Sequence, residues 1–223
     1  MLLTFLRDGY EKFYSQAFLL AVSHLRLRKW GPNAPEPLDA LSQALIIVLK
    51  ESFHKARDNM PQFTPESLDA MGIHLDNAYL SKTDLKKIYM RGASLRSAYF
   101  WMAQLQNAYL KHSDLEKAFL ANAHLEEANL GDTILTGANL SEAYLQKAGF
   151  HGARLNLANL TNADLTDANL SKADFTNANL TGTHPEKARS LQGTILRDVK
   201  GLSATQLAEC ASKGAIVDNL IST

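Results

Sequence analysis

The feature that most constrains this chain is a strict five-residue period. From Leu75 to Leu180 every fifth residue is large and apolar, which gives 22 positions, 18 of them leucine. The residue two places before each of these is small or β-branched, and it is alanine in 17 of the 22 cases. A pattern of this length indicates an internal repeat, which decides the fold class before any other signal. The four large residues other than leucine are Met90, Phe100, Phe150 and Phe175.

This period fits neither regular secondary structure. On an α-helix a step of five residues turns by about 500°, so the apolar residues would spread around every face. On a strand they would alternate between the two sides, because five is an odd number. They share one interior only if the backbone turns a corner with every repeat. No proline occurs between Glu66 and His184, as expected if backbone N–H groups bond from coil to coil. We therefore predict a β-solenoid.

The unit is plain in segments such as Ala158-Asn159-Leu160-Thr161-Asn162. Residues 73–183 resemble the pentapeptide-repeat family, whose motif is a small residue, then Asp or Asn, then Leu and two variable residues. The resemblance implies a right-handed quadrilateral β-helix with one repeat on each side and four repeats in each coil. On this interpretation the 22 repeats make about 5.5 coils.

A solenoid needs caps, because its ends expose unpaired backbone groups and apolar side chains. We expect residues 1–72 to form an α-helical N-terminal segment and cap. Its helices are predicted at about 4–29 and 40–53, and a third is predicted to start at Thr64, which precedes a proline. The residues expected on the apolar face of the second helix are Leu41, Ala44, Leu45, Val48 and Leu49.

The repeat pattern changes after residue 183. Pro185 stands where leucine is due, and the apolar residues that follow come one position late. We expect a bulge at 184–187 and a partial extra coil. Ser203 and Gln206 then fit a capping box that opens a short helix. Residues 184–223 are thus predicted to be an irregular partial coil with a C-terminal capping helix.

The residues that point outward lie just before the large apolar ones. Adding 20 to a residue number moves one coil along the same wall. In the early coils two such columns hold aromatic side chains where later coils hold asparagine, and Trp101 and Met102 are expected on the wall of the first column. The candidate partner-binding residues are Tyr79, Tyr99, Phe119, Trp101, Met102, Tyr89 and Tyr109.

Two explanations of this aromatic strip remain open. Exposed apolar patches often mark interaction surfaces, and aromatic side chains are favoured contact residues. Alternatively, the N-terminal segment packs over the strip, or the stacked rings only stabilise neighbouring coils. The solvent exposure of Trp101 distinguishes a free strip from a covered one.

The sequence shows no catalytic site. A filled interior leaves no room for a substrate, and flat walls offer no concave site. The seven histidines have no metal-ligand spacing, and neither a Gly-rich phosphate loop nor a Gly-x-Ser-x-Gly motif occurs. Cys210, the single cysteine, is expected to be a buried apolar residue. We therefore expect no enzyme activity, no metal and no cofactor.

Net charge and hydropathy limit which classes of partner and which cellular location are expected. The chain has 23 basic and 23 acidic residues, so no nucleic-acid partner is expected. No apolar run is long enough for a transmembrane segment. The first residues, MLLTFLRDGYEKF, have no basic residue before their apolar stretch, and charged residues interrupt that stretch, unlike in a signal peptide. The expected location is the cytoplasm.

Together these observations predict a non-catalytic, rigid protein–protein interaction scaffold with an unidentified protein partner. A homodimer through the N-terminal helices or a solenoid end is also considered. One alternative is a DNA-mimicking modulator of a type II topoisomerase (gyrase), as in some family members with markedly acidic walls. The ten basic and eleven acidic residues between positions 71 and 185 argue against it. Another alternative is a peripheral assembly component that docks through its N-terminal helices.

Overall fold

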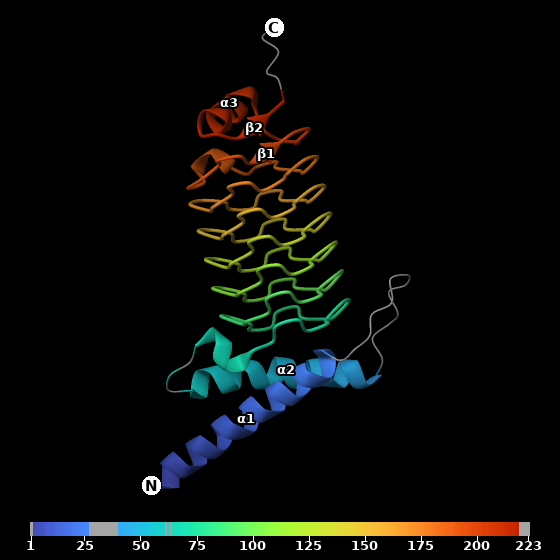
Figure 1. Cartoon of the computed structure of the whole chain (residues 1–223), viewed down its shortest axis with the longest axis vertical. Coiled ribbons are helices and arrows are strands. Elements are labelled where there is room, and N and C mark those ends of the chain that lie inside the picture. Colours follow the sequence, from blue (N-terminus) through green and yellow to red (C-terminus); the bar gives the residue numbers. More distant parts are fainter. Residues whose placement is uncertain (1, 27–39, 61, 63, 219–223) are drawn as a thin grey trace.

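Residues 2–26, 40–60, 62 and 64–218 are described by a computed structural model of the chain. A stack of coils runs along the long axis of the molecule, with helices at each end (Figure 1). Each coil contains 20 residues, because the outward residue of every repeat forms a parallel bridge to the residue 20 positions later, as from Tyr79 to Tyr99. With five residues in each repeat, a coil has four sides.

The backbone bonds that join the coils follow from this register. Leu80 N donates to Tyr99 O at 2.8 Å, and Tyr99 N donates to Ala78 O at 2.9 Å. Each side contributes one bridging residue rather than a long strand. The main-chain groups of an inner coil are therefore paired to the coils on both sides.

Every corner between two sides is a β-turn. At one of them Ala103 N donates to Phe100 O at 2.9 Å. The third residue of the turn has positive φ at every repeat from Gly72 to Gly182, with values between 53° and 73°. Such φ values suit type II turns and favour Gly and Asn. These turns are the physical reason why a five-residue unit can keep its leucine inside.

The interior of the stack is filled. All 22 large apolar residues from Leu75 to Leu180 are at most 1% exposed, and their small partners are buried as well. Where a partner is polar, its hydroxyl is bonded: Ser113 Oγ donates to Met90 O at 2.8 Å. Burying each large side chain contributes roughly 1.5–3 kcal/mol before conformational entropy is counted.

The coil stack begins one repeat earlier than residue 73. Asp69 already bridges to Tyr89, and the buried Ala70 occupies the position of the large residue. The helix expected to start at Thr64 is only a 3-10 turn, η1 (Pro65–Leu68). Because the coil starts directly after this turn, no length remains for a helix.

Two helices lie at the N-terminal end of the stack (Figure 1). They are α1 (Leu2–Arg26) and α2 (Ala40–Asn59). The rings of Phe18 and Phe53 meet at their interface, with centroids 5.3 Å apart. Positions 27–29 of the first predicted helix lie outside the described residues. No helix of the described residues is long and apolar enough to cross a membrane.

The apolar face expected for the second helix is wrong in part. Val48 and Ala44 are exposed, Leu45 is half-buried, and the side chain of Leu41 lies outside the described part of the chain. Positions 44–49 are all apolar, so the sequence there does not select one face. The contacts with α1 and the coils select it instead. The buried residues of α2 are Ile46, Leu49, Ser52, Phe53 and Ala56.

At the other end the register changes by one residue. The bridges now join positions 21 apart, as between Asp174 and Ile195. The inserted residue falls at the 3-10 turn η2 (Pro185–Lys187), where the buried Pro185 replaces a leucine. Proline cannot donate a backbone bond and fixes φ, so the turn becomes helical here.

The last elements complete this end. Strand β1 (Ile195–Leu196) pairs in parallel with β2 (Ile216–Val217), and α3 (Ala204–Ser212) lies between them in sequence. Gln206 N donates to Ser203 Oγ at 3.2 Å, and Ser203 N donates to Gln206 Oε1 at 3.1 Å. These two bonds form the capping box that opens α3.

Candidate functional site

Three aromatic rings form a continuous stack on one wall, the aromatic ladder of Tyr79, Tyr99 and Phe119. The first two ring centroids are 4.7 Å apart with planes 12° from parallel, and the next two are 4.6 Å apart with planes 3° from parallel. The bridge register places one ring directly over the next. Tyr79 is 67% exposed, and Phe119 is also exposed. The ladder is thus a rigid aromatic surface that faces solvent.

Trp101 and Met102 lie on the corner beside this wall, not on the wall itself. They are the two middle residues of the turn from Phe100 to Ala103, and Met102 has φ of 53°. The two variable residues of each repeat always form the corner, which is why the predicted position was wrong. Lys82 Nζ lies 4.7 Å from the centroid of the Trp101 ring, a cation–π geometry.

Tyr89 and Tyr109 do not join this surface. Their ring centroids are 5.6 Å apart, but they lie ten residues from the ladder residues in sequence. Ten residues are half of a 20-residue coil, so these rings lie on the opposite wall. The seven predicted residues therefore form two separate surfaces.

One aromatic pair was missed by the sequence prediction. His124 and Tyr144 stack with centroids 4.4 Å apart and planes 2° from parallel, on the wall next to the Trp101 corner. Adding 20 to a residue number places them in one column, so the signal was available. It was overlooked because this column does not begin with aromatic residues.

The described parts of the N-terminal helices do not cover the aromatic ladder. Trp101 is 44% exposed, and α1 and α2 lie across the end of the stack (Figure 1). Arg57 of α2 binds the first coil there: its Nη1 and Nη2 donate to the two carboxylate oxygens of Asp84 at 2.8 and 2.9 Å. Of the two intrachain explanations, coverage by these described helix residues is wrong. Ring stacking between coils is present.

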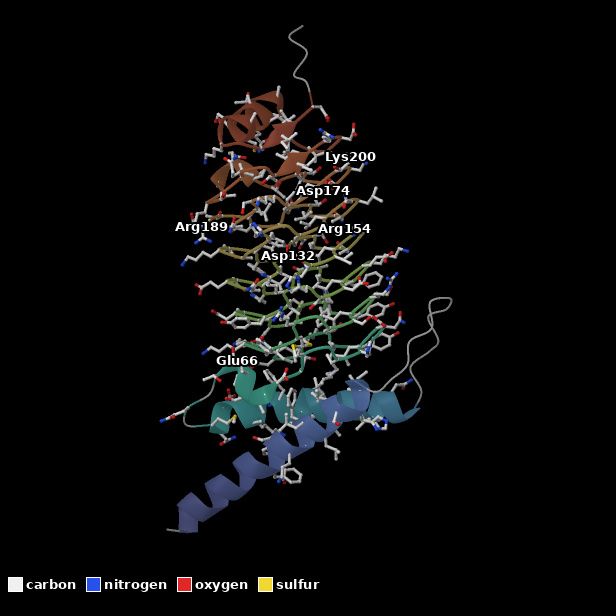
Figure 2. All side chains as sticks on the ribbon, in the orientation of Figure 1. Glu66, Asp132, Arg154, Asp174, Arg189 and Lys200 are labelled. Carbon is white, nitrogen blue, oxygen red and sulfur yellow. The ribbon has the colours of Figure 1, made fainter. Side chains whose placement is uncertain are left out.

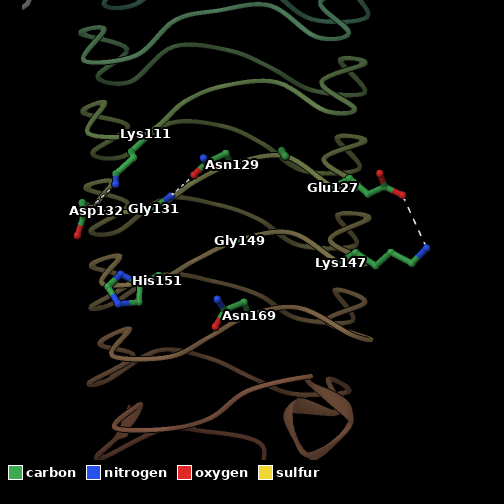
Figure 3. A pocket seen from close by; sticks show the side chains of 10 residues that line it. Lys111, Glu127, Asn129, Gly131, Asp132, Lys147, Gly149, His151 and Asn169 are labelled. Atoms are coloured by element: carbon green, nitrogen blue, oxygen red, sulfur yellow. Dashed lines mark hydrogen bonds and ion pairs between the residues drawn. The ribbon is translucent and has the colours of Figure 1, made fainter.

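A notch of about 390 Å³ lies on the wall of Tyr89 and Tyr109, where Gly149 supplies no side chain between Asn129 and Asn169 (Figure 3). Its rim carries two ion pairs. Lys111 Nζ lies 3.5 Å from Asp132 Oδ2, and Lys147 Nζ lies 3.7 Å from Glu127 Oε1 (Figure 3). Its charges are thus balanced and already paired within the wall.

Charged side chains of both signs occupy the outer surface (Figure 2). Arg154 and Asp174 are bridge partners in neighbouring coils. Burial raises the pKa of Asp174, but bonds from Thr176 and Asn156 and the charge of Arg154 lower it more, so the net shift is downward. The walls thus carry compensated charges.

The described residues contain no cluster of three or more His, Cys, Asp or Glu side chains that could hold a metal ion. Cys210 is buried, and burial, with a smaller effect of Glu186, raises the pKa of its thiol to about 11. A thiol with this pKa stays protonated near neutral pH and is a poor nucleophile.

Comparison with known proteins points to one family. A model described as pentapeptide repeats (8 copies) matches residues 73–111, 103–141, 123–162 and 143–182. No curated protein sequence matches. No enzyme family is indicated.

Several solved structures are similar to this chain. Rfr23, a pentapeptide repeat protein from the cyanobacterium Cyanothece 51142, is 27% identical over 67% of this chain and 91% of its own, with a TM-score of 0.30. HetL from Nostoc sp. strain PCC 7120, involved in heterocyst differentiation regulation, is 27% identical over 59% of this chain and 77% of its own, with a TM-score of 0.21. QnrB1, a plasmid-mediated fluoroquinolone resistance protein, is 17% identical over 68% of this chain and 74% of its own, with a TM-score of 0.43.

Because these TM-scores are low, the family assignment depends on the repeat sequence. The residues that match the family model are the same ones that form the filled coils. Proteins of this family fold as right-handed quadrilateral β-helices. The chain therefore belongs to the pentapeptide-repeat family.

Proposed function

We propose that this protein is a non-catalytic, rigid scaffold that binds a protein partner through the aromatic ladder and the adjacent Trp101. The observation that carries this proposal is the exposed stack of Tyr79, Tyr99 and Phe119 on a solid core. Aromatic residues are favoured at the centres of protein interfaces. An exposed aromatic surface of this kind supports protein binding more than it supports a purely structural role.

The geometry of the ladder also reduces the conformational entropy that is lost when a partner binds. Each ring of the ladder is held by its neighbour, with contacts of 4.6 to 4.7 Å between centroids. Side chains that are already ordered lose little conformational entropy when a partner binds. Lys82, over the Trp101 ring, adds a positive charge at the rim. The fitting partner presents an apolar patch with an acidic edge.

The test compares two triple variants in an affinity capture from native lysate. The first changes Tyr79, Tyr99 and Trp101 to serine. The matched control removes three aromatic rings from the other walls, with the changes Tyr89→Ser, Tyr109→Ser and Tyr144→Ser.

We expect the control to capture the same partner as the unmodified protein and the ladder variant to lose it. Capture by the ladder variant at the unmodified level, while both variants stay folded by circular dichroism, contradicts the proposal. Loss in the control alone would assign binding to the other walls.

The ends have a supporting role in this proposal. In this proposal the segments 1–72 and 184–223 cap a β-helix that comprises 73–183 and the early repeat from Asp69, in a cytoplasmic protein. Contacts at both ends support the caps: Arg57 binds Asp84 in the first coil, and Gln206 Nε2 of α3 donates to Thr183 O at 3.2 Å. Removal of either end is expected to expose coil backbone and cause aggregation.

Gyrase modulation remains an alternative that a supercoiling assay tests directly. A DNA mimic needs walls of net negative charge, whereas the tract carries ten basic and eleven acidic residues between positions 71 and 185. We expect no change in gyrase supercoiling when the purified protein is added. Inhibition or protection of gyrase would replace the scaffold proposal with this alternative.

A further inference from the structure

Helices α1 and α2 each contain a long segment without charged residues. No Asp, Glu, Lys or Arg occurs from Phe13 to Leu25, and none from Ala40 to Leu49. A helix at a protein surface normally has charged residues on its outer face. A helix without them is expected to be buried on more than one side.

Each of the two helices leaves part of its surface uncovered within the described part of the chain. Phe18, Val22 and Leu25 of α1 are buried, as are Leu49 and Phe53 of α2. The opposite sides carry large apolar residues in solvent, with Leu20 71% exposed and Ile47 61% exposed. We define the uncharged helical surface by these exposed residues, which are Phe13, Leu19, Leu20, Ile47 and Val48.

We propose that the uncharged helical surface binds the same surface of a second copy of this chain and forms a two-fold homodimer. Most soluble homo-oligomers are two-fold dimers in which one patch pairs with itself. Self-pairing fails when a patch carries charges of one sign. The five residues that define this surface carry no charge, and Lys50 and Glu51, which follow within one turn of Ile47, are of opposite sign, so pairing need not bury a lone charge.

The shape of this end fits a second copy. α1 is the outermost layer there, beyond α2, and its N-terminal half projects away from the coils (Figure 1). Its 25 residues span roughly 37 Å. Two such helix pairs can pack as four helices, with the coil stacks pointing outward. A membrane-binding helix would instead carry several Lys or Arg residues along its polar face, whereas positions 13–25 of α1 contain none.

This dimer is independent of the scaffold proposal, because it uses different residues. It would present two aromatic ladders on one assembly. A partner with two binding sites would then bind more tightly than a single site allows.

The test measures the mass of the full-length protein by light scattering after size-exclusion chromatography, across a dilution series. We expect twice the chain mass of 24.6 kDa. The variants Leu20→Glu and Ile47→Glu place charges in the interface and are expected to raise the dimer dissociation constant at least ~100-fold. The matched control is Leu157→Glu, at an exposed leucine of the coil stack, which should leave the dimer unchanged.

A second measurement covers the case in which a glutamate variant unfolds. Gln16 is exposed on α1 between Phe13 and Leu20, and the native Cys210 is buried. A short bis-maleimide should cross-link the Gln16→Cys variant into a covalent dimer. The variant Lys172→Cys, exposed on the coil stack, should not cross-link.

If the uncharged helical surface does not bind a second copy, these measurements give a different result. Each of the following results overturns the proposal. A monomer that sediments with phosphatidylcholine–phosphatidylserine vesicles, and loses this with Leu20→Glu, would assign the surface to a membrane. A monomer that neither cross-links nor binds vesicles would show that the surface does not bind a second copy. A dimer that survives both glutamate changes would place the interface elsewhere.

Discussion

Among single residues, each repeat has one corner position with positive φ, where the backbone restricts which residues fit without strain. Asn, Asp, Lys and Gly recur there, as at Asn162, Asp167, Lys172 and Gly182. The sequence contains this signal, but the prediction of the fold used only the apolar period. The inward residues could be predicted because every leucine is matched by a small partner. The two variable residues of each repeat follow no apolar pattern that would indicate the corner. Trp101 and Met102 were therefore predicted on the wall instead of on the corner.

Leu157 fits its corner position poorly. Its φ is 61°, it is 64% exposed, and a left-handed backbone costs most residues roughly 1–2 kcal/mol. We expect Leu157→Asn to raise the free energy of unfolding by about 0.5–1 kcal/mol, since asparagine tolerates this conformation. Urea unfolding followed by circular dichroism measures the change. The reverse substitution one coil later, Asn177→Leu, should cost a similar amount, and a gain from both would refute the explanation.

Gly149 lies in its column between two asparagines, Asn129 and Asn169. On another wall Asn159 Nδ2 donates to Asn139 Oδ1 at 3.4 Å in such a ladder. A Cβ at Gly149 would meet only Ala128 O, at 3.9 Å. We expect Gly149→Asn to raise the free energy of unfolding by roughly 0.5–1 kcal/mol, because glycine is the more flexible residue in the unfolded chain. The contrasting change Gly152→Ala should lower it, because alanine, unlike asparagine, does not tolerate the φ of +68° there and its Cβ would lie 2.6 Å from Asp132 Oδ1.

Between elements, the contact of α2 with the first coil was not predictable from the sequence. Arg57 and Asp84 lie 27 positions apart, and no period relates a helix residue to a coil residue. The choice of buried face on α2 was unpredictable for a similar reason, because its apolar run leaves several faces equivalent. The coils themselves were predictable, since each repeat contacts only copies of itself.

The Arg57–Asp84 pair makes this contact sensitive to acid. Burial raises the pKa of Asp84, but the bonds from Arg57 and from the Lys86 backbone, with the charges of both residues, together outweigh it, so the pKa lies below its ordinary value. A lowered carboxyl pKa stabilises the fold at pH above about 3.9, and this contribution is lost as pH falls through the folded-state pKa. We expect Arg57→Met to lower the free energy of unfolding by ~1–3 kcal/mol at pH 7.

The measurement is urea unfolding of the helices by circular dichroism between pH 7 and pH 3. The difference between Arg57→Met and the unmodified protein should shrink below about pH 4. The control is Lys147→Met, whose exposed pair with Glu127 should be worth less than ~1 kcal/mol. A difference for Arg57→Met that does not depend on pH would show that the arginine acts by packing alone.

At the scale of the whole molecule, the protein is a solid rod whose chemistry lies on its outside. The core that stabilises the rod also fills it, so binding depends on wall side chains. The two proposed surfaces would bind different molecules, the aromatic ladder another protein and the uncharged helical surface a second copy of the chain. Family membership fixes the coil architecture and leaves the wall residues to determine the partner.

Trp101 offers the most direct measurement of the central claim. The chain has two tryptophans, so the variant Trp30→Phe leaves Trp101 as the single reporter. The partner isolated by affinity capture is titrated into this variant while fluorescence and acrylamide quenching are recorded. We predict a saturable blue shift with reduced quenching, because binding removes water from the exposed indole beside the ladder. Unchanged emission and quenching at a partner concentration that saturates binding would contradict the assignment of this wall as the interface.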